Sequence, residues 1–128
     1  MRKIKVVVAG CLGRMGQEIV KQTIANKKLE FIGGCEHRSH PSLNQKISKV
    51  TSIKSNLIVT SNTNFIFKKA DVIIDFTTPS STLTNVKKAS LYRTAIVIGT
   101  TGISNSQKNK IKNYAKTFPI LMSSNMSV

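Results

Sequence analysis

The chain has 128 residues, of which 40% are hydrophobic and 20% charged, a composition typical of a single water-soluble globular domain. No apolar run approaches the roughly 18 residues of a membrane span, and the short basic start leads into glycines rather than a signal-peptide cleavage site, so we expect a cytoplasmic protein without a membrane partner. The formal net charge is +15, but the 20 lysines and arginines are spread along the chain, which favours a solvated basic surface and no nucleic-acid partner.

Short apolar runs alternate with longer amphipathic segments in chain order. Residues 4–9 are almost all apolar, which is typical of a strand buried on both faces. A helix is predicted over residues 14–28, with four apolar residues spaced for one face: Met15, Ile19, Val20 and Ile24. Further strands are predicted over residues 31–35, 57–60, 72–76, 94–98 and 119–122, and further helical segments over 64–69, 79–92 and 104–116.

Strands that alternate with helices form βαβ units, whose strands are parallel and whose crossovers are right-handed. We therefore predict an α/β fold with a Rossmann-like, doubly wound parallel sheet of five to seven strands. In such sheets ligands bind outside the carboxyl ends of the strands, so the loops that follow the strands are the place to look for function.

The turn between the first strand and the first helix, AGCLGRMGQ, contains Gly10, Gly13 and Gly16. Gly10 can make the tight turn, Gly13 leaves room for a pyrophosphate against the backbone, and Gly16 lets the helix approach the sheet. The N-terminus of the helix then offers free N–H groups and a partial positive charge to the phosphates. The pattern predicts a dinucleotide-binding turn, in which Arg14 either adds a cation or faces water and Met15 packs against the protein.

An acidic residue follows the second predicted strand. Glu36 comes about 20 residues after Gly16, where a carboxylate accepts hydrogen bonds from the adenosine ribose of a dinucleotide. The alternative is an ordinary solvent-facing glutamate. His37 and Arg38 come next, and an arginine here can pair with a 2′-phosphate and so admit NADP as well as NAD, or both can be plain loop residues.

The cysteines and histidines lack the spacing of a metal site. Cys11 and Cys35 form no CxxC pair, so we expect two reduced thiols. His37 and His40 have no third ligand at a suitable spacing, so we predict no bound metal ion.

Three further segments fall at the ends of predicted strands: IDFTTP at residues 74–79, IGTTG at 98–102 and SSNMSV at 123–128. Together with AGCLGRMGQ at 9–17, they resemble in order and spacing the N-terminal half of dihydrodipicolinate reductase. The resemblance covers essentially the whole chain. It implies NADH or NADPH as the cofactor, and hydride transfer to the dihydrodipicolinate-level intermediate of diaminopimelate and lysine synthesis.

The resemblance also implies roles for individual residues. Residues 11–16 would form the pyrophosphate loop, and Glu36 would hold the adenosine ribose. Gly99, Thr100 and Thr101 would lie beside the nicotinamide and its ribose, with Thr101 near a substrate carboxylate. The alternative for the two threonines is that they only cap a turn.

The last loop, residues 124–127, would close over the nicotinamide and hold its carboxamide through backbone groups. Asp75 would brace the strand-end loops rather than touch a ligand. The complete set of implied cofactor-binding residues is Gly10, Cys11, Leu12, Gly13, Arg14, Met15, Gly16, Glu36, His37, Arg38, Gly99, Thr100, Thr101, Ser124, Asn125, Met126 and Ser127.

The chain departs from the family pattern in three ways. His37 stands where the family often has an arginine, with Arg38 one place later, so the choice between NADH and NADPH stays open. Ser124 and Met126 replace the alanine and the aromatic residue of the family's A-N-F-S loop. Family members are also roughly double in length, and their second half carries the catalytic lysine and the sheet on which a homotetramer assembles.

We therefore expect residues 1–128 to be one dinucleotide-binding domain, monomeric by itself, that binds cofactor weakly and contains no catalytic residue. Three alternatives stay open: another Rossmann-type NAD(P)-dependent dehydrogenase, a non-enzymatic basic nucleic-acid-binding module, and a cofactor-binding remnant with a regulatory or vestigial role.

Overall fold

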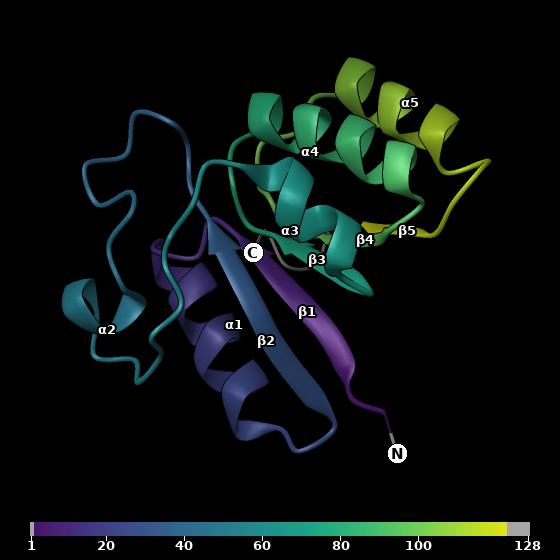
Figure 1. Cartoon of the computed structure of the whole chain (residues 1–128). Helices are drawn as coiled ribbons and strands as arrows, with labels where there is room; N and C mark the ends of the chain where they lie inside the picture. Colours follow the sequence, from purple (N-terminus) through teal and green to yellow (C-terminus); the bar gives the residue numbers. More distant parts are fainter. Residues whose placement is uncertain (1, 123–128) are drawn as a thin grey trace.

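The computed structural model describes residues 2–122. In that part, five parallel strands form one sheet in the order β2-β1-β3-β4-β5, with helices on both faces (Figure 1). The strands are β1 (Ile4–Ala9), β2 (Leu29–Cys35), β3 (Val72–Asp75), β4 (Ala95–Ile98) and β5 (Ile120–Met122). The helices are α1 (Arg14–Ala25), α2 (Ile47–Val50), α3 (Thr63–Lys69), α4 (Pro79–Tyr92) and α5 (Asn105–Tyr114). The predicted doubly wound α/β fold is confirmed.

The central strand β1 is buried on both faces. Val6 and Val8 belong to one apolar cluster, together with Val20 of α1, whereas Val7 and Ala9 belong to a second cluster with side chains of α3, α4 and α5. Successive side chains of a strand point to opposite faces, so an unbroken apolar run supplies both layers of the core. In Figure 1, α1 and α2 accordingly lie on one side of the sheet and α3, α4 and α5 on the other.

The strand order changes direction at β1. The chain passes from β1 outward to β2, then crosses back and adds β3, β4 and β5 on the other side of β1. Such a reversal leaves a crevice at the carboxyl ends of the two strands that flank it, here β1 and β3. We therefore expect a ligand site at the loops that begin at Gly10 and Phe76.

The strand predicted over residues 57–60 is wrong. Thr60 alone pairs with β2, through a single parallel bridge to Cys35. The preceding residues pair instead with the loop before α2, where the Val59 N–H donates to the Gln45 carbonyl at 3.0 Å. The backbone of this segment forms hydrogen bonds both with the segment before α2 and with β2. Only one bridge therefore forms beside β2, where a sixth strand would have paired.

The apolar face predicted for the first helix is also partly wrong. Met15 and Ile24 are 49% and 45% exposed, whereas the buried residues of α1 are Gly16, Val20 and Thr23. These three follow the i, i+4, i+7 spacing of one helix face. Gly16 has to touch the backbone of the preceding turn, and this contact sets the rotation of the helix and turns Met15 toward solvent.

Most other predicted elements are confirmed within a few residues. The helix over residues 79–92 is found with the same bounds, while α1 ends at Ala25 and β2 begins at Leu29. The last helix begins directly after Ser104, whose side chain forms a reciprocal capping box with Gln107. Across residues 2–122, no helix is long and apolar enough to cross a membrane.

The close contact between α1 and the glycine turn gives a stability prediction. A Cβ added at Gly16 would overlap the Gly10 carbonyl group, so Gly16→Ala should lower the free energy of unfolding by about 1–3 kcal/mol or prevent folding. Gly13→Ala is the matched control, because the nearest protein atom to its added Cβ is the Gly10 oxygen at 3.4 Å. Urea denaturation measures both, and equal losses would contradict the prediction.

Candidate functional site

The loops after β1 and β3 begin with hydrogen bonds to the ends of the neighbouring strands. The Gly10 N–H donates to the Cys35 carbonyl at 2.9 Å. On the other side of β1, the Phe76 N–H donates to the Ala9 carbonyl at 3.0 Å. The sheet ladder thus continues into the loops and holds the glycine turn between the ends of β2 and β3.

Glycine is present at the three positions of the turn for different structural reasons. Gly10 has a φ of +80°, which favours glycine, and a Cβ there would overlap the Phe76 carbonyl. Gly16 lies against the Gly10 carbonyl. Gly13 has an ordinary φ of −70°, is exposed, and has no protein atom closer than 3.4 Å to an added Cβ. The protein itself requires two of the glycines, and the third leaves open space over the backbone.

This open space lies at the N-terminus of α1. Gly13 is the N-cap residue, no side chain caps the helix, and its first turn contains no acidic residue. The first N–H groups of a helix have no partner within the helix, so they are available to an anion. Arg14 is exposed and belongs to neither ion pair found in residues 2–122, and Met15 is exposed beside it.

The two cysteines lie beneath the turn. Cys11 is 1% exposed, with its side chain against Gly34, and burial raises its pKa to about 12, aided by the charge of Glu36. Cys35 is also buried, and its pKa is raised chiefly for the same reason. Both are free thiols, as predicted, and at the turn Cys11 presents its backbone rather than its sulfur.

Glu36 is held against the glycine turn. Its carboxylate oxygen Oε2 accepts a hydrogen bond of 2.7 Å from the Leu12 N–H, and the side-chain amide of Gln17 donates to the Leu12 carbonyl at 2.8 Å. The acid is therefore directed at a turn from which α1 and β2 separate it in the sequence. Within residues 2–122, no three His, Cys, Asp or Glu side chains lie close enough together to hold a metal ion.

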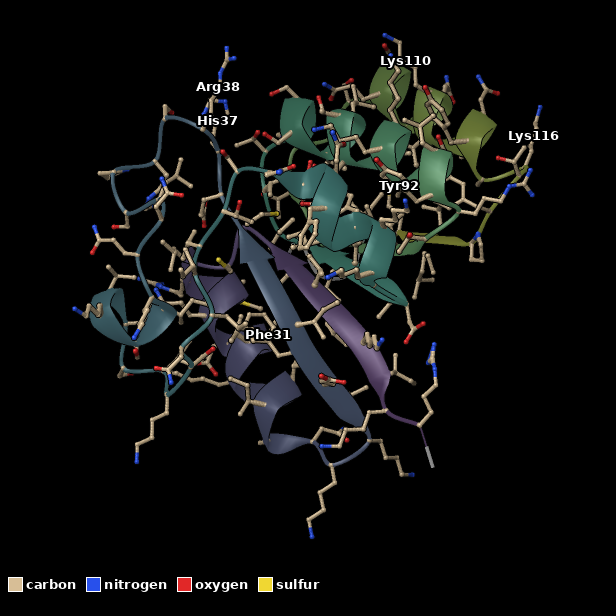
Figure 2. All side chains as sticks on the ribbon, in the orientation of Figure 1. Phe31, His37, Arg38, Tyr92, Lys110 and Lys116 are labelled. Atoms are coloured by element: carbon tan, nitrogen blue, oxygen red, sulfur yellow. The ribbon has the colours of Figure 1, made fainter. Side chains whose placement is uncertain are left out.

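Two cavities meet at Glu36. The first, of about 300 Å³, lies over the glycine turn and is lined by Gly10, Leu12, Gly13, Glu36, His37, His40, Phe76, Thr77, Thr78 and Ser81. The second, of about 390 Å³, lies between the end of β2, the start of α3 and one face of α4. It is lined by Cys35, Glu36, His37, Arg38, Ser61, Thr63, Thr77, Ser80, Ser81, Thr84, Asn85 and Lys88. Figure 2 shows His37 and Arg38 at the outer end of the loop that follows β2.

The loops after β3 and β4 are joined by a buried hydroxyl network. Asp75 is fully buried and accepts a hydrogen bond of 2.6 Å from the Thr77 hydroxyl. The Thr100 hydroxyl accepts from the Thr77 N–H at 2.9 Å and from the Thr82 hydroxyl at 2.8 Å. Asn85 completes the network with a long amide contact of 3.5 Å to Asp75. Asp75 therefore braces these loops, as the sequence predicted.

The residues predicted beside a nicotinamide lie on the second of these loops. The hydroxyl of Thr100 points into the network, whereas Thr101 is exposed. A Cβ at Gly99 would overlap the ring of Phe76, so this glycine has a packing reason of its own. Ser124, Asn125, Met126 and Ser127 lie outside the described residues.

The sequence analysis did not assign any residue of α4 to the site at this edge of the sheet. Ser81, Asn85 and Lys88 all line the second cavity, at positions i, i+4 and i+7 of the helix. The i, i+4, i+7 spacing of these polar residues is visible in the sequence. Its meaning is not, because the sequence does not show that this face of α4 lies opposite the end of β2.

The parallel sheet, its reversal at β1 and the glycine turn at that reversal define a Rossmann-type α/β protein. A family model described as dihydrodipicolinate reductase, N-terminus, matches residues 4–126. The chain belongs to this family.

Individual relatives agree with this assignment. A 4-hydroxy-tetrahydrodipicolinate reductase from Pelagibacter ubique is 43% identical over 129 residues, covering 100% of this chain and 46% of that protein. The dipicolinate-bound dihydrodipicolinate reductase from Paenisporosarcina sp. TG-14 has a TM-score of 0.74 at 25% identity, over 95% of this chain and 47% of that one. An aspartate semialdehyde dehydrogenase from Candida albicans, solved with NADP, shares the fold at 15% identity, with a TM-score of 0.70 over 95% and 42% of the two chains. The chain spans about half the length of the curated relatives it matches.

The buried Asp75 gives a prediction about pH. Burial raises the pKa of Asp75 above its ordinary 3.8, against the opposing effect of its hydrogen bonds. The folded state then holds this proton more tightly than the unfolded state, so the contribution of Asp75 to the free energy of unfolding falls as the pH rises from 3.8 through the folded pKa. Asp75→Asn cannot ionise and should remove this part of the decline in urea denaturation at a series of pH values. An unchanged pH dependence in the variant would count against the prediction.

Proposed function

We propose that this chain is the NAD(P)H-binding half of a dihydrodipicolinate reductase. In the complete protein it would serve hydride transfer to the dihydrodipicolinate-level intermediate of diaminopimelate and lysine synthesis in the cytoplasm. The observation that carries the proposal is the hydrogen bond from the Leu12 N–H to the Glu36 carboxylate. It joins an anion-accepting turn and a ribose-accepting acid at two adjoining cavities.

The pyrophosphate of the cofactor would bind at the glycine turn. The donor groups there are the backbone N–H groups of the first turn of α1, and the space is the one that Gly13 leaves open. Arg14 is exposed beside it and adds a positive charge. Backbone donors and a helix N-terminus suit an anion, so the residues present fit this group.

The adenosine would lie beyond the turn, in the second cavity. Oxygen Oε2 of Glu36 is already bound to the Leu12 N–H, whereas Oε1 makes no hydrogen bond within residues 2–122. A carboxylate with one oxygen anchored is held in place for ribose hydroxyls. A cavity of about 390 Å³ falls within the usual range for small-ligand sites.

The nicotinamide would lie along the loops after β3 and β4. The Thr100 hydroxyl ties its loop to the loop after β3, so the exposed Thr101 projects from a braced backbone. This arrangement supports the assignment of Thr101 to a substrate carboxylate. When bound, the cofactor supplies the hydride, and the chain's own contribution is to orient it against the substrate.

The other expected partners follow from the same proposal. The substrate is a small anionic molecule, and the complete protein assembles as a homotetramer, whereas residues 1–128 are monomeric by themselves. The +15 charge supports attraction of an anionic cofactor and substrate. Residues 1–128 alone bind cofactor without reductase turnover, since no residue among them is assigned as the proton donor.

Calorimetric titration with NADH and NADPH tests the cofactor site. The chain should bind saturably, and Gly13→Ala should weaken binding of both cofactors by about tenfold or more, because the methyl group takes the space of the pyrophosphate. Glu36→Gln should cost a similar factor, because a charged acceptor for the ribose is lost. Glu30→Gln is the matched control for the loss of charge, because Glu30 is an exposed acid of β2 that lines neither cavity.

The competing interpretations give different results in the same experiment. Binding of a DNA duplex that falls steeply with salt, without any binding of NADH or NADPH, would favour the nucleic-acid module. Cofactor binding that is unaffected by both Gly13→Ala and Glu36→Gln would mean that the cofactor occupies another site.

A further inference from the structure

The proposed adenosine cavity contains a lysine that the cofactor site described above does not use. Lys88 lies on α4, on the same face as Ser81 and Asn85, and lines the second cavity. Its side chain is half-buried, and its ammonium donates a hydrogen bond of 2.8 Å to the Thr63 hydroxyl at the start of α3. An ammonium group has three N–H donors, so two are left for other partners.

The charge of Lys88 is not neutralised by a neighbouring acid. The two ion pairs found in residues 2–122 join Arg2 to Asp71 and Lys21 to Glu18, and neither involves Lys88. The ammonium acts electrostatically on the end of β2, because it opposes the rise in the pKa of the Cys35 thiol. The free positive charge is therefore close to the strand end that leads into Glu36.

The groups that surround this charge suit a phosphate. Arg38 lines the same cavity from the loop after β2, so two cations border it from different elements. Ser61 and Thr84, which carry hydroxyl groups, line the same cavity. Lysine, arginine and hydroxyl side chains are the usual protein partners of a phosphomonoester, with lysine acting as a point charge.

The position of Glu36 identifies which phosphate can reach the cavity. If the adenosine ribose lies at Glu36, as the proposed function requires, a substituent on the 2′ position enters the cavity that Lys88 and Arg38 line. The Glu36 carboxylate is drawn toward the glycine turn by the Leu12 N–H. The cations are thus available to a phosphate on the other side of this acid.

We propose that Lys88, together with Arg38, forms a subsite for the 2′-phosphate of the cofactor and makes this chain bind NADPH in preference to NADH. The proposal rests on the proposed function, because it assumes that the adenosine lies at Glu36. Lys88 is assigned here as the residue that determines specificity from α4, a part of the fold distant in sequence from the acid at the end of β2.

The test compares NADPH with NADH, and 2′,5′-ADP with 5′-AMP, by calorimetric titration of the chain and of Lys88→Gln. Glutamine removes the charge and keeps a side-chain amide that can donate to Thr63. The wild-type chain should bind NADPH about tenfold tighter than NADH, and Lys88→Gln should remove most of this preference while NADH affinity changes by less than about twofold. The two fragments should show the same difference as the complete cofactors.

Two further variants separate charge from packing. Lys87→Gln removes an exposed lysine from the same helix turn and should leave the ratio of the two affinities unchanged. Thr63→Val removes the hydrogen-bond partner of Lys88 but leaves its charge, so the preference for NADPH should persist. Thermal melting of each variant establishes that it is folded at the temperature of the titration.

The possible failures are distinguishable. If NADH binds at the site and NADPH binds no tighter, or if Lys88→Gln weakens both cofactors equally, the phosphate subsite is refuted and the proposed function stands. If neither cofactor binds saturably, the proposed function and the subsite fall together. Loss of the preference in Lys87→Gln as well would assign it to overall charge rather than to Lys88.

Discussion

The contact on which the site depends is that between Gly16 of α1 and the Gly10 carbonyl in the preceding turn. It brings the start of α1 against the backbone that leaves β1, and it decides which face of α1 packs on the sheet. The free N–H groups of α1 are thereby held above the carboxyl end of β1. Glu36 is then fixed to the same turn through the Leu12 N–H, so one close backbone contact positions both halves of the proposed cofactor site.

A second brace lies on the other side of β1. Asp75 is buried among hydroxyl groups that link the loops after β3 and β4, and its burial disfavours the charged form. A buried polar network of this kind is favourable only when its members are all hydrogen-bonded, and within residues 2–122 no buried side-chain polar atom lacks a partner. The Thr100 hydroxyl forms hydrogen bonds within this network, whereas the next residue, Thr101, is exposed to solvent.

The local patterns that succeeded were those whose cause lies within a few residues. The unbroken apolar run of β1, the proline start of α4 and the capping box at Ser104 each predicted an element that the structure contains. The patterns that failed depended on distant partners. Residues 57–60 were predicted as a strand, but their backbone hydrogen bonds go partly to the segment before α2 and only at Thr60 to β2. Met15 was predicted to pack against the protein, but the rotation of α1 exposes it.

The fold class, the family and the chemistry of the glycine turn could be predicted from the sequence, because apolar periodicity and the spacing of glycines are local properties of the chain. The tertiary structure was needed to show that Glu36 is anchored to Leu12 and that one face of α4 lines the second cavity. Those facts depend on how β2, α3 and α4 pack together at one edge of the sheet. The spacing of residues along the chain carries no direct record of such contacts, because each joins segments separated by a complete helix or strand.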